Sequence, residues 1–141
     1  MCTACDISPA MVTAINRMAE VSHTISRDHG FWEDEERILE ALSPIVEDWR
    51  VFFNALVASK LALIDSESSE ALGCVRTGEV AAGFMELRDE NWKPNGIASE
   101  LADIMIRTAE LAMWLNIDLG LAIQTKTNYN KTRPHKHGKV M

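Results

Sequence analysis

Four acidic residues form two pairs with the same spacing. Glu67 and Glu70 lie three residues apart, and Glu100 and Asp103 repeat that step further along the chain. On a helix, residues three apart project from the same side. Each pair also borders a stripe of apolar residues instead of lying opposite it. Both pairs are therefore expected to face partly into the protein.

Carboxylates that face a protein interior need a positive partner, because burying an ionised carboxylate alone costs several kcal/mol. A hard divalent cation suits oxygen ligands, and Mg²⁺ bound through carboxylates and substrate phosphates is the usual biological form. The candidate ligands are Glu67, Glu70, Glu100 and Asp103, with Mn²⁺ as a substitute for Mg²⁺. Such pairs also occur on solvated helix faces. Two pairs on two helices favour the metal site without excluding that interpretation.

A second group of residues, near the end of the chain, is suited to phosphate. Lys126 and Asn130, four residues apart, share one helix face, and Arg133 follows them. Ammonium and guanidinium groups bind phosphate oxygens. The basic stretch continues with His135, Lys136, His137 and Lys139. Taken alone, this segment is better interpreted as a solvated basic tail.

The elements that must position these residues are helices. Apolar residues recur at steps of three and four along the chain, and no alternating strand pattern bounded by turns is found. The pattern predicts helices over residues 9–29, 48–76, 97–115 and 116–131, a short helix or connector over 33–46, and loops with a short helix over 77–96. The expected helix caps are Asp6 or Ser8, Asn95, and Asn116 or Asp118. Residues expected to face the core include Leu61, Ala71, Val75, Leu101 and Leu111.

The size and composition fit a single domain over residues 1–141, with residues 1–7 and 134–141 as flexible ends. The net charge of −7 argues against a protein that binds a nucleic-acid polymer. No apolar run reaches about 18 residues, so we expect no membrane span. Cys2, Cys5 and Cys74 are odd in number and lack a second pair at zinc-binding spacing. Reduced thiols in a cytoplasmic protein fit this set best.

The order and spacing of three motifs resemble a known family. SESSE at 66–70, ELAD at 100–103 and KTNYNKTRPHKHGK at 126–139 are similar to the MazG-like branch of the all-α nucleoside triphosphate pyrophosphatases. The family pattern is E-E-x-x-E on one helix, E-x-x-D on the next, and a Lys/Asn/Arg set on the last. The similarity extends from about Asn54 to Lys139, and residues 12–33 resemble the family's first helix and substrate-side turn. Ser66 replaces the first Glu of the pattern, which puts any accessory role of that acid in doubt.

The resemblance implies an all-α bundle of four to five helices, completed by association into a homodimer or homotetramer. It also implies Mg²⁺-dependent hydrolysis of (d)NTP to (d)NMP and pyrophosphate, by attack of water at the α-phosphorus. In that mechanism Glu67 or Glu70 orients the water, while Lys126, Asn130 and Arg133 hold the phosphate chain. Trp32, which follows the HGF turn, is the tryptophan expected to stack on the nucleobase.

Two other interpretations use the same acids. A ferritin-type di-metal oxidase requires Glu-x-x-His pairs, and no histidine follows Glu67 or Glu100 at that spacing, so we reject it. A non-catalytic helical interaction or regulatory module, in which the acids form a solvated surface, stays open. The sequence does not identify the base or the sugar of the nucleotide.

Overall fold

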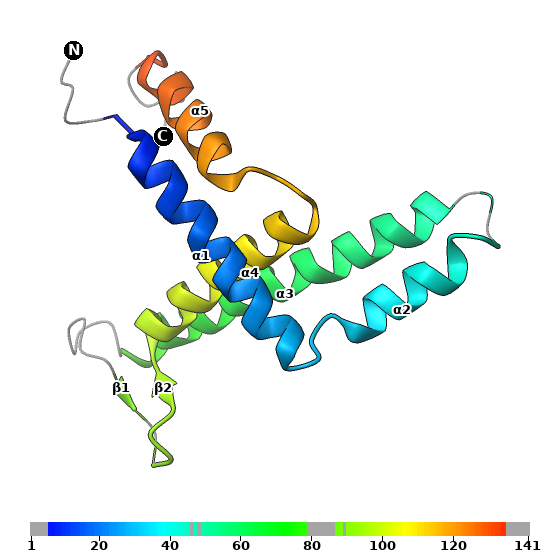
Figure 1. The fold of residues 1–141 in the computed structure, drawn as a ribbon. Coiled ribbons are helices and arrows are strands. Elements are labelled where there is room, and N and C mark those ends of the chain that lie inside the picture. Colours follow the sequence, from blue (N-terminus) through cyan, green and yellow to red (C-terminus); the bar gives the residue numbers. More distant parts are fainter. Residues whose placement is uncertain (1–5, 46, 48, 79–86, 89, 135–141) are drawn as a thin grey trace.

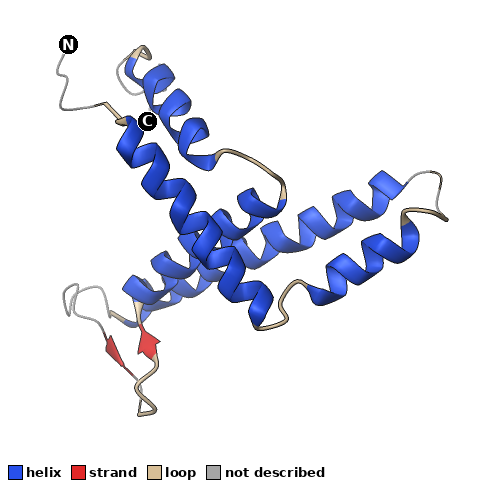
Figure 2. Cartoon of the chain, in the orientation of Figure 1, coloured by secondary structure: helices blue, strands red, loops and turns tan. Residues whose placement is uncertain are grey.

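The computed structural model describes residues 6–45, 47, 49–78, 87–88 and 90–134. These residues form helices and one short pair of strands (Figures 1 and 2): α1 (Pro9–Asp28), α2 (Glu33–Leu42), α3 (Trp49–Thr77), β1 (Leu87–Arg88), β2 (Pro94–Asn95), α4 (Ile97–Trp114) and α5 (Leu119–Lys131). The chain is therefore mostly helical, as the sequence predicts. Among the helices described, none is both long and apolar enough to span a membrane.

The arrangement places α4 at the centre of the fold (Figure 1). Helix α4 packs most extensively against α3 and also against α1, which crosses it. Helix α2 contacts α3, and α5 runs beside the first part of α1. The two helices that carry the acidic pairs, α3 and α4, are therefore packed directly against each other.

Side-chain caps fix the start of α1 and of α5. The Ser8 hydroxyl and the Asp118 carboxylate each accept a hydrogen bond from the amide of the third residue of their helix, at 3.3 and 2.8 Å. The structure thus selects Ser8 and Asp118 from the predicted alternatives, and Asn116 remains outside α5. Asp6 instead forms an ion pair with Lys131, which joins the start of the described chain to the end of α5.

The segment before α4 differs from the prediction. Strands β1 and β2 pair antiparallel, with Leu87 opposite Asn95, where the sequence pattern indicates no strand. The predicted cap Asn95 belongs to β2, and α4 is capped by Gly96, whose φ of 84° favours glycine. The Gly96 carbonyl accepts a hydrogen bond from the Glu100 amide at 3.2 Å, so Glu100 lies in the first turn of α4. Residues 79–86 and 89, which belong to the 77–96 segment where loops with a short helix are predicted, lie outside the described residues.

Within the described residues, the core consists mainly of small side chains around the ring of Trp32. Trp32 is 2% exposed, and the other buried apolar residues are Ala19, Ala71, Cys74, Ala109, Leu111 and Ala112. The ring of Trp32 lies 5.0 Å from His23 and 5.2 Å from Trp114, which stacks on Phe53 at 5.2 Å. The core prediction is correct for Ala71 and Leu111. It is wrong for Leu61, Val75 and Leu101, which are 53%, 51% and 51% exposed in the single chain.

The close approach of α5 to α1 requires glycine at the first turn of α5. A Cβ on Gly120 would lie 2.5 Å from the Val12 carbonyl oxygen and 2.9 Å from the Val12 Cα. Asn16 fixes the same junction, because its side-chain oxygen accepts the Gly120 amide at 2.8 Å and its side-chain nitrogen donates to Asp118 at 2.8 Å. Backbone on both sides of the contact leaves no room for a methyl group.

We expect Gly120→Ala to destabilise the protein by about 1–3 kcal/mol, because the backbone of α1 or α5 must shift. Gly73→Ala is the matched control, since no atom lies within 4 Å of a Cβ at that position in the interior of α3. The control should stabilise the protein by about 0.5–1 kcal/mol, the usual gain from replacing glycine inside a helix. Urea unfolding followed by circular dichroism measures both. A Gly120→Ala protein as stable as wild type would contradict the packing of α5 on α1.

Candidate metal centre

Three of the four predicted ligands meet where α3 packs on α4. Glu67 of α3 and Glu100 and Asp103 of α4 each bring one carboxylate oxygen into a group whose members all lie within 4.8 Å of one another. Glu67 is only 6% exposed, and the two acids of α4 are partly buried. Three like charges at this separation need a cation or a proton between them. An all-oxygen set of this kind fits a hard divalent cation.

The pKa of Glu100 reflects the close approach of these acidic side chains. Burial raises the pKa of Glu100, and the negative charges of Glu70, Glu67 and Asp103 raise it further. A side-chain hydrogen bond between Glu100 and Glu67 adds to the shift in the pKa of Glu100, because it favours the protonated carboxyl. The raised pKa means that the neutral carboxyl of Glu100 is favoured by its surroundings more than that of an isolated Glu.

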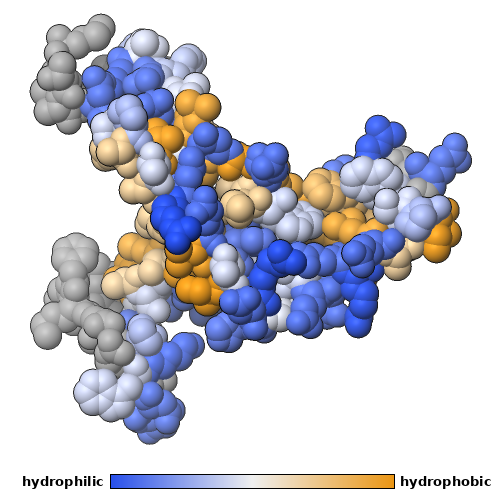
Figure 3. All heavy atoms as spheres, in the orientation of Figure 1, coloured by the Kyte–Doolittle hydropathy of each residue, from blue (hydrophilic) through white to orange (hydrophobic). Residues whose placement is uncertain are grey.

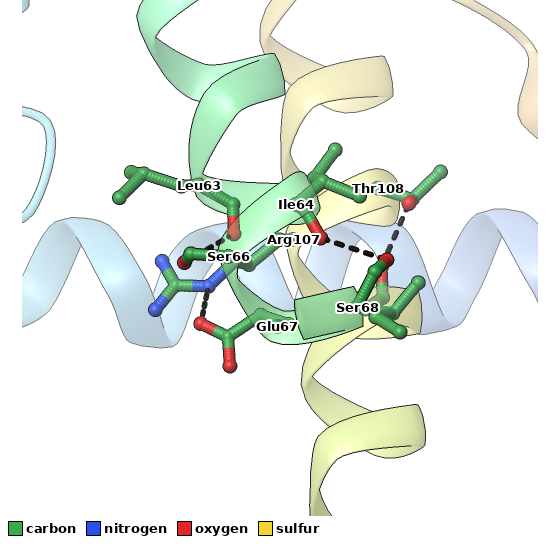
Figure 4. A network of polar contacts seen from close by, with 8 residues as sticks. Leu63, Ile64, Ser66, Glu67, Ser68, Arg107 and Thr108 are labelled. Carbon is green, nitrogen blue, oxygen red and sulfur yellow. Dashed lines mark hydrogen bonds and ion pairs between the residues drawn. The ribbon is translucent and has the colours of Figure 1, made fainter. Parts of the chain in front are cut away.

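Glu70, the fourth predicted ligand, lies beside the group of three and not within it. Its side chain is exposed, yet its charge acts on Glu100. Ser66, at the position where the family pattern has Glu, is exposed too, and its hydroxyl donates to the Leu63 carbonyl at 2.9 Å (Figure 4). Glu70 is therefore an exposed acid of α3 whose charge still acts on the group of three.

Arg107 balances the charge of Glu67 and was not predicted from the sequence. Its Nε donates to Glu67 Oε1 at 2.6 Å, from α4 across to α3 (Figure 4). Arg107 follows Asp103 by four residues, so the two share one face of α4. That spacing is the signal from which the residue could have been found.

A pocket of about 190 Å³ lies beside the carboxylates. Arg107 connects the two, because it lines the pocket and also donates a hydrogen bond to Glu67. Its walls come from α1, the turn before α2, α3 and α4: Ser26, Phe31, Trp32, Lys60, Leu63, Arg107, Glu110 and Leu111. Lys60 is a second cation that sequence analysis missed. Its Nζ lies 2.6 Å from a Glu35 carboxylate oxygen and donates to the Phe31 carbonyl at 3.1 Å. The pocket thus combines two cations with an apolar floor.

Trp32 forms part of this pocket but mostly belongs to the core. One face of its ring lies under Lys60 Nζ, 4.2 Å from the ring centroid, and His23 and Trp114 pack around it. Trp32 Nε1 and His23 Nδ1 have no hydrogen-bond partner within the described part of the chain. The neighbouring Phe31 is 67% exposed at the same pocket. Phe31, which sequence analysis did not single out, therefore offers the more accessible ring.

The predicted phosphate-binding residues lie elsewhere in the single chain. Lys126, Asn130 and Arg133 are on or just after α5, which packs on α1 (Figure 1). Lys126 Nζ lies 5.5 Å from the centroid of the Tyr129 ring. In the described ranges, no hydrogen bond or ion pair joins these three residues to the four acids. His135, Lys136, His137 and Lys139 lie outside the described residues, as do Cys2 and Cys5.

Comparisons of the chain with known protein families, with curated proteins and with solved structures found no match. The geometry of the carboxylates and of the adjoining pocket is therefore the basis for a functional proposal.

The raised pKa of Glu100 predicts how the metal-free protein responds to pH. The folded state binds this proton more tightly than the unfolded chain, so the contribution to stability is fully present below the ordinary Glu pKa of 4.5 and is lost as the pH rises through the raised value. With a chelator present, the midpoint of thermal unfolding should fall as the pH increases above about 4.5. Glu100→Gln should weaken this dependence. Equal slopes for the variant and wild type would show that Glu100 does not carry it.

Proposed function

We propose that the protein is a Mg²⁺-dependent nucleoside triphosphate pyrophosphohydrolase, which converts (d)NTP and water to (d)NMP and pyrophosphate. The supporting observation is the convergence of Glu67, Glu100 and Asp103 within 4.8 Å, beside a pocket that contains Lys60 and Arg107. A ligand suited to both features carries a cation, several negative charges and an organic part. A nucleoside triphosphate complexed with Mg²⁺ has all three.

The acids divide into two roles. Glu67, Glu100 and Asp103 would hold the cation, which when bound neutralises triphosphate oxygens and the charge that develops at the α-phosphorus. Arg107, freed from its pairing with Glu67, binds a phosphate oxygen through a charge-assisted hydrogen bond. Glu70 orients the attacking water, because its carboxylate is exposed and lies outside the group of three.

The reaction proceeds by displacement at the α-phosphorus. The water oxygen forms a bond to phosphorus while Glu70 accepts its proton. The bond between the α-phosphorus and the α–β bridging oxygen breaks, and its electron pair leaves with pyrophosphate. The products are one nucleoside monophosphate and one pyrophosphate, with no orthophosphate.

We also propose that the chain associates with a second copy of itself. A groove of about 520 Å³ between α1, α4 and α5 is lined almost entirely by apolar residues: Ala14, Ile15, Met18, Ile104, Met105, Thr108, Leu119 and Ile123. Figure 3 shows apolar surface where α5 meets α1. The described part of the single chain has no large side chain below 2% exposure, so its own core is small for 141 residues. A second copy is the partner that is always available to complete it.

Self-association also accounts for the position of the α5 residues. Lys126 follows Ile123 of the groove by three residues, so the two side chains project from the same side of α5. In a dimer, or a tetramer of two dimers, Lys126, Asn130 and Arg133 act on the phosphate chain bound by the other copy.

The reaction is tested with a panel of NTPs and dNTPs in the presence of Mg²⁺, scored separately for pyrophosphate and orthophosphate. Glu67→Gln and Asp103→Asn should each lower turnover by at least about 100-fold and leave the circular dichroism spectrum of the helices unchanged. Asp65→Asn is the matched control, since Asp65 is an exposed acid on α3 outside the group of three. Release of orthophosphate alone would contradict cleavage between the α- and β-phosphates. Absence of carboxylate-dependent Mg²⁺ or Mn²⁺ binding would favour the non-catalytic interaction module.

The proposed interface is tested by placing a charge in the groove. Met105, 58% exposed in the single chain, lines it, and Met105→Glu should shift the protein towards monomer in size-exclusion chromatography with light scattering. Burial of the methionine side chain contributes about 1.5–3 kcal/mol per copy to association. A glutamate at this position loses that contribution and adds the cost of burying a charged carboxylate. Ile38→Glu introduces the same charge at an exposed apolar residue of α2 outside the groove and should leave the mass unchanged. A monomeric wild type at micromolar concentration would overturn the proposal.

A further inference from the structure

We propose that the pocket lined by Phe31, Lys60 and Glu110 is the nucleobase subsite, and that Glu110 makes it select guanine. This inference rests on the proposed function, because it assigns the base of a nucleotide whose phosphates lie at Glu67, Glu100 and Asp103. The pocket's 190 Å³ is smaller than the roughly 300–1,000 Å³ of sites that enclose a whole ligand. It therefore suits one planar part of a nucleotide.

The spacing along α4 fits the length of a nucleotide. Glu110 follows Asp103 by seven residues, about 10 Å along the helix axis. That distance is comparable to the separation between the far edge of a base and the α-phosphate of an extended nucleotide. Arg107 lies between the two acids and lines the pocket while it contacts Glu67, so it marks the continuous path from the carboxylates to the pocket.

The walls of the pocket suit an aromatic ring. Phe31 is 67% exposed and Leu63 and Leu111 provide apolar surface, while the buried Trp32 closes the pocket beneath Lys60. Base–aromatic stacking contributes favourably for every base, because each base has a π face. Stacking on Phe31 therefore explains retention of a base but not choice among bases.

The polar groups of the pocket determine which base binds best. The Glu110 carboxylate is held by a hydrogen bond with Ser26 and lies within the electrostatic influence of Arg107 and Lys60. The pKa of Glu110 is raised, mainly by burial and to a smaller extent by the charge of Asp103, and the hydrogen bond with Ser26 and the charges of Arg107 and Lys60 oppose this rise. The two cations thus favour the ionised carboxylate that the proposal requires. The carboxylate of Glu110 and the ammonium group of Lys60 thus line the same pocket.

Guanine is the base whose edge matches that pattern. Its N1–H and its exocyclic amino group are adjacent donors, which one carboxylate accepts together, and its O6 accepts from a neighbouring cation. Cytosine and adenine each offer a single amino group, and thymine and uracil offer one N–H between two carbonyls. We therefore expect Glu110 to contact N1 and N2 of guanine, and Lys60 to contact O6.

The test measures binding and turnover separately. Binding of α,β-imido analogues of dGTP, dITP, dCTP and dTTP is measured by calorimetry with Mg²⁺, and kcat and KM are measured for the natural triphosphates. Wild type should bind the dGTP analogue at least about tenfold more tightly than the dTTP analogue, with the dITP analogue, which lacks the amino group, between them. Glu110→Gln should lower the affinity for the dGTP analogue about tenfold and raise the KM for dGTP more than it changes kcat. The same variant should leave the affinity for the dTTP analogue unchanged.

Two control variants separate base selection from folding and from general binding. Glu40→Gln changes an exposed acid of α2 outside the pocket and should retain the guanine preference. Phe31→Leu should lower the binding affinity for all four analogues to a similar extent, because it removes the stacking contact and leaves the polar contacts in place. Equal affinity of wild type for all four analogues, or a guanine preference that survives Glu110→Gln, would overturn the subsite assignment even if the enzyme is active. Guanine-selective binding without hydrolysis would support the subsite and contradict the proposed reaction.

Discussion

The structure depends on how the charge of one buried carboxylate is balanced. Glu67 lies between α3 and α4 at 6% exposure, with Glu100 and Asp103 near it and Arg107 bonded to it at 2.6 Å. An uncompensated charge at this depth would oppose the packing of the two helices. The guanidinium of Arg107 supplies a positive charge at this contact between α3 and α4, and the raised pKa of Glu100 reflects the crowding of negative charge there.

The same contact explains why the chain has so little core of its own. The buried residues of α3 and α4 include the small side chains of Ala71, Ala109 and Ala112. Small side chains bury little apolar area, so each contributes little to stability. Larger apolar residues of the same helices, such as Leu72 and Met105, are left 49% and 58% exposed. The converging carboxylates and the exposed apolar side chains therefore accompany the same packing of small residues between α3 and α4.

Features governed by local spacing could be predicted from the sequence, whereas features governed by packing could not. The helices and the caps at Ser8 and Asp118 follow from residues within a few positions of each other. The cap at Gly96 was missed because its positive φ accompanies the turn from the β1–β2 pair into α4. The role of Lys60 in the pocket could not be predicted, because it depends on the packing of the turn that carries Phe31 against α3. The position of α5 relative to the acids likewise depends on tertiary packing, because α5 packs on α1.

The balance of charges also constrains how a ligand can enter. Lys60 is paired with Glu35 and Arg107 with Glu67, so a ligand that draws either cation away leaves a carboxylate without its partner. A phosphate chain alone would take Arg107 from Glu67 and leave three acids close together. A divalent cation alone would compete with Arg107 for Glu67. Under the proposed function, a cation that binds together with the nucleotide would replace Arg107 at Glu67, and Arg107 would pair with phosphate. Binding of the metal and of the nucleotide would then be coupled, each raising the affinity for the other by the same factor.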